Sequence, residues 1–339
     1  MIRSCLTLVL SLLLLMGCPL TGSREDAAAS YVETLGQSLE IDPDFSRIPT
    51  VTALPSKRAR RLEMPEIDMG LMDFLSLYGC ELQLVVGERT STLGRVAHPG
   101  TRLDYHIKFI SAAEDCLPKI DSETRAQSLR AAAQAKRDSI PEALWNGIWG
   151  ASEMEGFFSR SGGTLPADPD PEVFRDASAR IGIVLAMIDA LEPGRVPEEL
   201  GQLNSVYKHW QARPLAGQVL RSAEALRARL DDATDLLRRR LGQASPCAAG
   251  ADAYRRLFEK QYLGSMVPRL SLVRHDGRRL FDRLHHLLHA PGAPVPDAMS
   301  PFIERNLQTG PGSIWYALDQ SISGHIKAWN QLLAQCRQS

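Results

Sequence analysis

Residues 214–241 read PLAGQVLRSAEALRARLDDATDLLRRRL, a stretch that is typical of one long helix. Arg238, Arg239 and Arg240 fall in its last turn, where positive charge interacts favourably with the helix dipole. A loop that begins at Gly242 follows it. Much of the remaining chain shows the same organisation, with apolar residues three or four positions apart between loops rich in Pro and Gly.

This pattern predicts an all-α fold, a multi-helix array or bundle joined by Pro/Gly-rich loops. No strand-length alternation of apolar and polar residues and no repeat of fixed period is present. An arrangement of two helical lobes that share one core is also compatible, with a boundary near residues 162–171. The expected helices cover residues 26–39, 65–86, 101–116, 122–149, 172–191, 198–211, 214–241, 251–289 with a kink at Pro268, 301–307 and 314–336.

Two segments are expected to lack helices. Residues 42–64 contain Pro43, Pro49 and Pro55 beside a basic cluster at residues 57–61, which predicts an extended arm. Residues 87–100 are expected to form a loop.

The N-terminus is typical of an exported protein. Arg3 precedes an apolar run that ends at Leu15, and Gly17 and Cys18 follow, which predicts a signal peptide over residues 1–17. A Cys directly after the cleavage site is the pattern of a bacterial lipoprotein, with Cys18 carrying acyl chains such as palmitate and residues 18–25 forming a short tether. A plain secreted protein and an uncleaved anchor are the alternatives, but a spanning helix needs about 20 apolar residues. By resemblance to lipoproteins of bacteria with two membranes, Pro19 after the acylated Cys indicates the outer membrane.

Composition narrows the class of protein. The chain has 39 Lys and Arg against 40 Asp and Glu, a net charge of −1, and loss of residues 1–17 removes one Arg and no acid. The mature chain has a net charge of −2. Nucleic-acid-binding domains are usually basic, so this charge gives no indication of nucleic-acid binding. Hydrophobic content of 44% and charged content of 23% are those of an ordinary globular protein, so we expect a soluble body that faces the periplasm.

Four cysteines remain after removal of Cys5 with the signal peptide and acylation of Cys18. In an exported protein they indicate two disulfide bonds, for which three pairings exist. The favoured pairing is Cys80 with Cys116, which joins neighbouring predicted helices, and Cys247 with Cys336, which joins a loop to the last helix. Free thiols are an alternative, whereas zinc is disfavoured because no C-x-x-C pair is present.

Residues 87–95 read GERTSTLGR and residues 102–105 read RLDY. This segment resembles the signature of DUF3080, a family of uncharacterised proteobacterial lipoproteins, although Thr90 stands where the family pattern has Asn. The resemblance extends over residues 26–339 and places Cys80 and Cys116 at the two Cys positions of the family. It implies a lipoprotein and no particular reaction.

The segment has two physical interpretations. In the first, it is a helix end that turns sharply, with hydroxyl groups binding unpaired amides. In the second, Arg89, Arg95 and Arg102 form a polar pocket for an anionic group such as a carboxylate or phosphate. An envelope hydrolase that uses Arg89, Ser91 and Arg95 is a related hypothesis, but no strand and elbow of the kind that presents a serine nucleophile is visible.

A metal site is a third hypothesis. His285 and His289 lie one helical turn apart, a spacing that can bind zinc. The Glu of an H-E-x-x-H metalloprotease motif is absent, and an exposed helix flank explains the same residues.

The sequence therefore favours a lipid-anchored, non-enzymatic envelope lipoprotein with a binding or accessory role and no cofactor. We expect it to contact the membrane through its anchor, and another envelope protein is a candidate partner.

Overall fold

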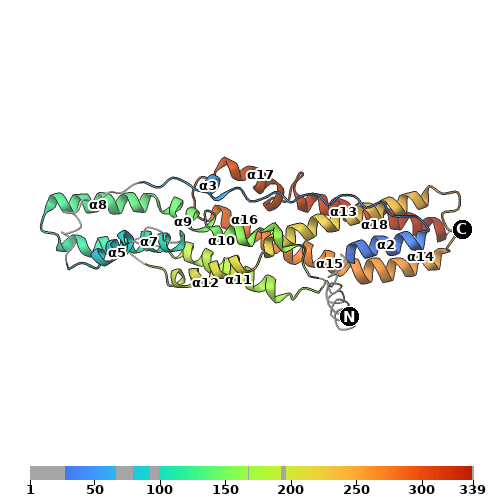
Figure 1. Ribbon diagram of the computed structural model, residues 1–339, viewed down its shortest axis with the longest axis horizontal. Coiled ribbons are helices and arrows are strands. Elements are labelled where there is room, and N and C mark those ends of the chain that lie inside the picture. The colour runs from blue at the N-terminus through green and yellow to red at the C-terminus, as the bar shows by residue number, and fades with distance from the viewer. Residues whose placement is uncertain (1–26, 66–78, 92–98, 167, 192–195, 338–339) are drawn as a thin grey trace, which may run out of the picture.

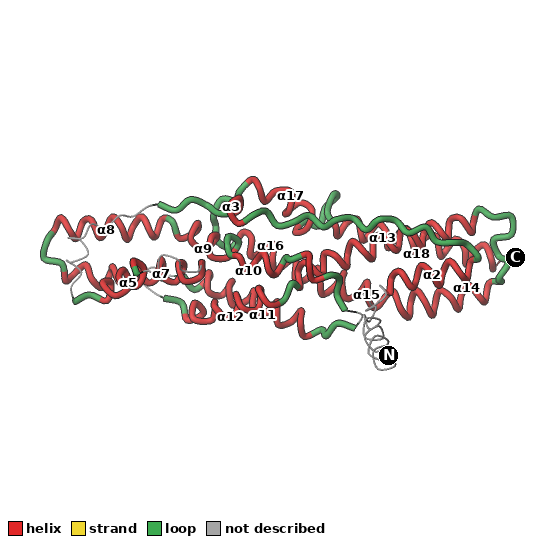
Figure 2. Tube along the Cα trace, viewed as in Figure 1, coloured by secondary structure: helices red, strands yellow, loops and turns green. Residues whose placement is uncertain are grey.

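The protein is an elongated array of helices in a computed structural model that describes residues 27–65, 79–91, 99–166, 168–191 and 196–337 (Figure 1). Within these ranges the chain forms helices and loops and no strand, which confirms the all-α prediction (Figure 2). None of the helices found there is both long enough and apolar enough to cross a bilayer. The predicted signal peptide and Cys18 lie outside the described residues.

One end of the array is built around a long central helix, which the sequence of residues 214–241 predicted. This helix, α13, packs against the last helix of the chain and against the first helix described, α2. The bounds of these three helices are Leu215–Leu241 for α13, Ile314–Arg337 for α18 and Ala27–Leu39 for α2.

A continuous helical run lies beside these three helices and continues to the middle of the molecule. It contains two π-helical segments on either side of the predicted kink at Pro268, which has no amide hydrogen to donate. Its parts are α14 (Ala251–Leu257), η4 (Phe258–Met266), α15 (Val267–Ser271), η5 (Leu272–Gly277) and α16 (Arg278–His289).

Shorter helices surround α16 and the start of α13 in the middle of the molecule. Residues before and after the 162–171 loop contribute side chains to the same large core, among them Trp149 and Phe174. The helices are α9 (Ile140–Ile148), α10 (Ser152–Phe157), η2 (Arg160–Gly162), α11 (Glu172–Asp189), η3 (Glu198–Gln202), α12 (Leu203–Ala212), η6 (Asp297–Met299), α17 (Ser300–Phe302) and η7 (Ile303–Leu307).

The other end of the molecule has a separate, smaller core. It is formed by α5 (Glu81–Thr90), the second half of α7 (Pro99–Cys116), η1 (Leu117–Lys119) and α8 (Glu123–Asp138), which we call the small lobe. Helix α7 connects the two cores, because Leu103 and Ile107 pack in the large one whereas Phe109 and Ala113 pack in the small one.

The structure corrects two predicted boundaries in the small lobe. The expected single helix 65–86 is wrong because the chain turns at Gly79, with φ of 82°, and Cys80 is the N-cap of a new helix, α5, that contains residues 81–86. The part of the prediction at residues 66–78 lies outside the described residues. The expected loop 87–100 is also wrong at both ends. Helix α5 continues through Gly87 to Thr90, and α7 begins at Pro99.

Both disulfide bonds have the pairing that we favoured. Cys80 is bonded to Cys116, with Cα atoms 5.4 Å apart, and Cys247 is bonded to Cys336, with Cα atoms 5.2 Å apart. The first bond ties the start of α5 to the end of α7. The second ties the loop before α14 to the end of α18.

The predicted extended arm runs along most of the length of the molecule from the end of α2 (Figure 2). Its only described helix is a single turn, α3 (Lys57–Arg60), which Ser56 caps by accepting a hydrogen bond from the amide of Ala59. Arg60 is fully buried and donates hydrogen bonds to the carbonyl oxygens of Trp149 and Ala151. The arm is therefore packed into the body through a basic residue.

Candidate functional site

One face of α7 in the small lobe carries four side chains suited to binding. Arg102, Tyr105, His106 and Phe109 follow a spacing of three, one and three residues, which places them on the same side of a helix. The disulfide bond at the far end of α7 joins α5 to this helix, and α8 also packs against α7.

Lys136, in the last turn of α8, lies over this face. Its Nζ is 4.8 Å from the ring centre of Tyr105 and 4.9 Å from that of Phe109. The residue is only 9% exposed, and its ammonium group has no hydrogen bond or ion pair to any residue that the structure describes. Aromatic ring faces attract a cation, by about 0.5–2 kcal/mol, but they do not neutralise its charge.

Further cations lie close to Lys136 or to Arg102. The guanidinium carbon of Arg89, in the last turn of α5, is 5.9 Å from the Tyr105 ring centre. Burial, with the charges of Arg61 and Arg89, lowers the pKa of Arg102. We call Arg61, Arg89, Arg102 and Lys136 the basic cluster.

Burial and the nearby charge of Arg89 lower the pKa of Lys136 to about 8. Both causes act in the same direction, since each makes the protonated amine less favourable. An anion bound next to the ammonium group would reverse this shift. The group is therefore charged at neutral pH, yet its charge is costly in the ligand-free protein.

His106 is an uncharged neighbour of the basic cluster. Burial, together with the charge of Lys136, lowers its pKa to about 4. Its Nε2 lies 2.6 Å from the carbonyl oxygen of Lys136, and because a carbonyl only accepts hydrogen bonds, Nε2 carries the proton. His106 thus holds the backbone of Lys136 in place without adding charge.

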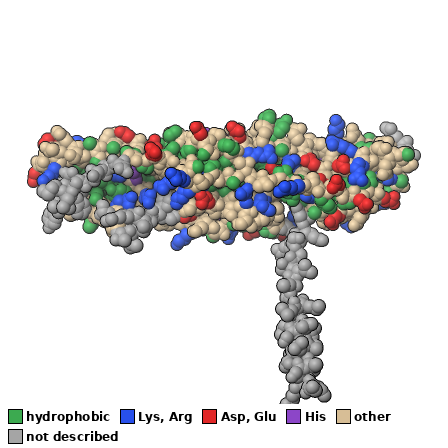
Figure 3. All heavy atoms as spheres, turned by 45° about the horizontal axis from the view of Figure 1, so that its top comes forward, with side chains coloured by type: hydrophobic (Ala, Val, Ile, Leu, Met, Phe, Trp, Pro, Cys, Tyr) green, Lys and Arg blue, Asp and Glu red, His purple; other side chains and the backbone are tan. Residues whose placement is uncertain are grey.

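The geometry is suited to a small anion. Lys136 and Arg89 lie at the ring of Tyr105, and Arg61 and Arg89 are close enough to Arg102 to add to burial in lowering its pKa. Figure 3 shows basic side chains gathered near the junction of the small lobe with the rest of the molecule. Guanidinium and ammonium groups make strong charge-assisted hydrogen bonds to carboxylate and phosphate oxygens. No described acid pairs with Lys136, so its ammonium group has capacity for a negative ligand.

The structure brings together two of the residues expected from sequence in the polar pocket, Arg89 and Arg102. Arg95 and Cys18 lie outside the described residues. Ser91 is exposed and its Oγ donates a hydrogen bond to the carbonyl oxygen of Glu88, 2.7 Å away, at the end of α5. The turn interpretation expects the hydroxyl group to accept from an unpaired amide, whereas this bond goes to a carbonyl oxygen of the last turn of α5.

His285 and His289 lie side by side on α16, with ring centres 5.1 Å apart and planes nearly perpendicular. Burial and the neighbouring His289 lower the pKa of His285. Throughout the described ranges, no group of three or more His, Cys, Asp or Glu side chains is arranged to hold a metal ion.

Sequence reasoning did not single out Lys136 or the aromatic pair beneath it. The spacing of residues 102, 105, 106 and 109 is a signal that could have identified the α7 face. The position of Lys136 over that face depends on how α8 packs against α7. This packing cannot be inferred from the sequence around Lys136.

Comparison with known proteins gives one match. A family model described as "Protein of unknown function (DUF3080)" matches residues 28–339. No curated protein and no solved structure matches the chain.

Proposed function

The chain belongs to the DUF3080 family, whose molecular role is unknown, and we propose that it is an envelope lipoprotein that binds a small anion at the basic cluster. The ligand class is a carboxylate or phosphate group, and the role is binding rather than catalysis. The proposal deepens the pocket hypothesis for Arg89 and Arg102 and adds Lys136 as its central residue.

The observation that carries the proposal is the burial of Lys136 without a counter-ion among the described residues. A buried ammonium group costs folding free energy, which is why buried charges are ordinarily paired. An unpaired ammonium group beside the charge of Arg89 is a group for which a ligand would supply the missing negative charge. Strongly perturbed pKa values of this kind cluster at functional sites.

The lipid anchor at Cys18 is the second part of the proposal. It is supported by the sequence of residues 1–18 and by the two disulfide bonds, which are typical of exported proteins. Several acyl chains on one Cys would hold the protein at the outer membrane, with the helical body in the periplasm.

Titration of the purified chain with inorganic phosphate at low ionic strength tests the anion site. We expect saturable binding that Lys136→Met weakens at least tenfold, because the variant keeps the apolar stem and removes the charge. The melting temperature of the variant should not fall, since the substitution also removes the cost of a buried charge.

Lys119→Gln provides the control, because Lys119 is an exposed lysine of the same lobe, in η1. It should bind phosphate as the parent protein does. Equal affinity of the parent and Lys136→Met, or absence of saturable binding to the parent, would refute the anion site.

Membrane fractionation tests the anchor separately. The parent protein should sediment with outer membranes, whereas Cys18→Ser should leave the chain uncleaved or release it from that fraction. Mass spectrometry of the mature N-terminus should find acyl chains on Cys18, and an unmodified terminus would contradict the proposal.

A further inference from the structure

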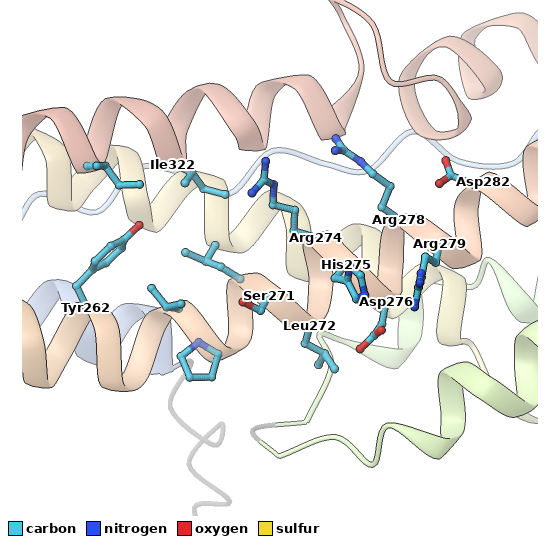
Figure 4. Close-up of a pocket in the computed structure, with 14 residues that line it drawn as sticks. Tyr262, Ser271, Leu272, Arg274, His275, Asp276, Arg278, Arg279, Asp282 and Ile322 are labelled. Carbon is cyan, nitrogen blue, oxygen red and sulfur yellow. The ribbon is translucent and has the colours of Figure 1, made fainter.

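A groove of about 890 Å³ lies along the outer side of the helical run 251–289, where that run faces α18 (Figure 4). Its volume is within the range of about 300–1,000 Å³ that small-molecule sites occupy. One part of its wall is apolar, with Val267 and Leu270 on α15 opposite Ile322 and Ile326 on α18. This part offers a surface for a hydrocarbon chain.

The other part of the groove is charged, with Arg274, Arg278 and Arg279 in its lining together with Asp276 and Asp282. Arg274 donates to Oδ1 of Asp319 at 2.8 Å and Arg278 donates to Oδ2 of the same carboxylate at 3.0 Å. Two guanidinium groups therefore share one carboxylate, and the buried Nε of Arg278 has no hydrogen-bond partner. Figure 4 shows Arg274 and Arg278 directed to the same side of the helix, with Asp276 directed to the other.

The wall of the groove also exposes an apolar side chain to solvent, because Ile326 on α18 is 39% exposed. Isolated exposed apolar residues need no explanation, but Ile326 lines an open groove that also contains two arginines. The groove is therefore amphipathic, with apolar side chains in one part and charged side chains in the other.

The backbone of the groove wall is unusual as well. The segments 258–266 and 272–277 are π-helical, and both contribute lining residues, Tyr262 and Arg274 among them. Segments of π-helix are rare and occur frequently at functional sites. Here they lie on each side of Pro268 and form part of the groove wall.

The groove lies close to the start of the described chain. The ring of Tyr262 is 6.2 Å from that of Tyr31, in the second turn of α2. Eight residues separate Cys18 from Ala27, and an extended chain spans at most about 3.5 Å per residue. An acylated Cys18 would therefore hold the start of α2 within about 30 Å of the bilayer surface.

We infer that this groove binds a single lipid with an anionic headgroup, its acyl chain along Val267, Leu270 and Ile326 and its headgroup at Arg274 and Arg278. The expected access to membrane lipid rests on the proposed anchor, whereas the binding chemistry does not. The site is distinct from the basic cluster, which lies in the small lobe.

Fluorescence titration with the polyene fatty acid cis-parinaric acid tests the site on the chain carrying Cys18→Ser, which has no acyl chains of its own. We expect saturable binding. Arg274→Gln should weaken binding at least fivefold, because it removes a positive charge that pairs with the headgroup. Ile326→Asp should weaken binding at least tenfold, because it places a charge in the apolar wall. The methyl ester of the probe should bind at least fivefold more weakly than the acid.

Matched controls distinguish these effects from general loss of charge or fold. Arg255→Gln removes an exposed arginine that is paired with Asp252 outside the groove, and Leu84→Asp changes a 70% exposed leucine in the small lobe. Both controls should bind the probe as the parent chain does. Equal loss in the controls and in the groove variants, or no binding to the parent, would overturn the inference.

A second arm separates the sources of lipid. Vesicles containing phosphatidylglycerol should compete with the probe if the groove takes a membrane phospholipid, and vesicles of phosphatidylcholine alone should not. Competition by palmitate with none by either vesicle assigns the groove to free fatty acids. The assay uses Cys18→Ser and therefore does not depend on the anchor. If the variant binds the probe but the parent protein does not sediment with outer membranes, the proposed anchor is refuted and the proposed lipid site is not.

Discussion

At the scale of single residues, buried polar side chains connect segments that are distant in sequence. Arg60 joins the extended arm to the middle of the molecule through the carbonyl oxygens of Trp149 and Ala151, 2.8 and 3.1 Å away, and pairs with Glu155 at 3.0 Å. Burial lowers the pKa of Arg60, and the charge of Glu155 opposes this shift. The side chain acts as the main polar contact between the arm and α9–α10.

Arg60→Met should lower the free energy of unfolding by about 2–4 kcal/mol, because it leaves two buried carbonyl oxygens without their donor. Urea denaturation followed by circular dichroism measures the change. Arg58→Ala is the control, since Arg58 lies in the same helical turn and is exposed. A loss below 0.5 kcal/mol for both variants would show that the arm contributes little to stability.

His325 is a second buried residue with a physical consequence. It is fully buried between α2, α13 and α18, where its Nε2 lies 2.7 Å from the hydroxyl of Tyr31 and its Nδ1 lies 3.0 Å from that of Thr234. Thr234 donates its own proton to the carbonyl oxygen of Leu230, so Nδ1 of His325 is the donor to Thr234. Burial lowers the pKa of His325 to about 3.

Acid should therefore destabilise the protein through His325. The unfolded state, with a pKa near 6.5, binds a proton that the folded state excludes, so stability is complete above that pH and falls as the pH decreases from about 6.5 toward 3. The slope from this residue approaches about 1.4 kcal/mol per pH unit. The parent should lose about 2 kcal/mol more than His325→Gln between pH 7 and pH 5 in urea denaturation, and equal losses would refute this assignment.

At the scale of elements, each disulfide bond fixes the end of a helix. The Cys80–Cys116 bond closes 36 residues of the small lobe, and the Cys247–Cys336 bond closes 89 residues of the large bundle. Cross-links of this length restrict the unfolded chain and contribute about 2–4 kcal/mol each. Only the first one joins α5, the helix that carries Arg89, to α7.

Removal of each bond should therefore have a different effect on anion binding. Cys80→Ser with Cys116→Ser should lower both stability and phosphate affinity. Cys247→Ser with Cys336→Ser should lower stability by a similar amount and leave the affinity unchanged. Phosphate titration and melting curves of the two double variants measure this, and parallel effects on affinity would contradict the location of the site.

The sequence predicts those helices whose boundaries are marked by nearby residues, and it does not predict features that depend on tertiary packing. The helices at 215–241 and 314–337 match their predicted ranges within two residues, because apolar spacing and flanking Gly or Pro are local features. The start of α5 could not be predicted, because the φ of Gly79 is set by the turn and not by the apolar pattern around it. The site was half predicted: Arg89 and Arg102 stand in a recognisable segment, whereas Lys136 joins them only through tertiary packing.

At the scale of the whole molecule, the two cores are unequal. The small core buries ten hydrophobic residues, whereas the large core extends over most of the rest of the described chain and includes α2, α11, α13, α16 and α18. Local unfolding free energies follow the amount of apolar surface that each unit buries. The small lobe, which carries Arg89 and Lys136 of the basic cluster, is therefore the less stable unit.

Hydrogen exchange followed by mass spectrometry should detect this difference. Amides of α5 and α8 should exchange earlier than those of α13 and α18, and phosphate should slow exchange in α5 and α8 alone. A single rate for all four helices would show that the cores unfold as one unit.

The contact between Tyr31 and His325 spans 294 residues, so the first and last long helices that the structure describes belong to the same bundle. Ribosomes make proteins from the N-terminus, so α2 is synthesised well before α13 and η4, against which it packs, and before His325 on α18. During that interval its apolar face is open to chaperones and to misassociation. Nascent chains that stop short of α18 are expected to be substrates for quality-control proteases.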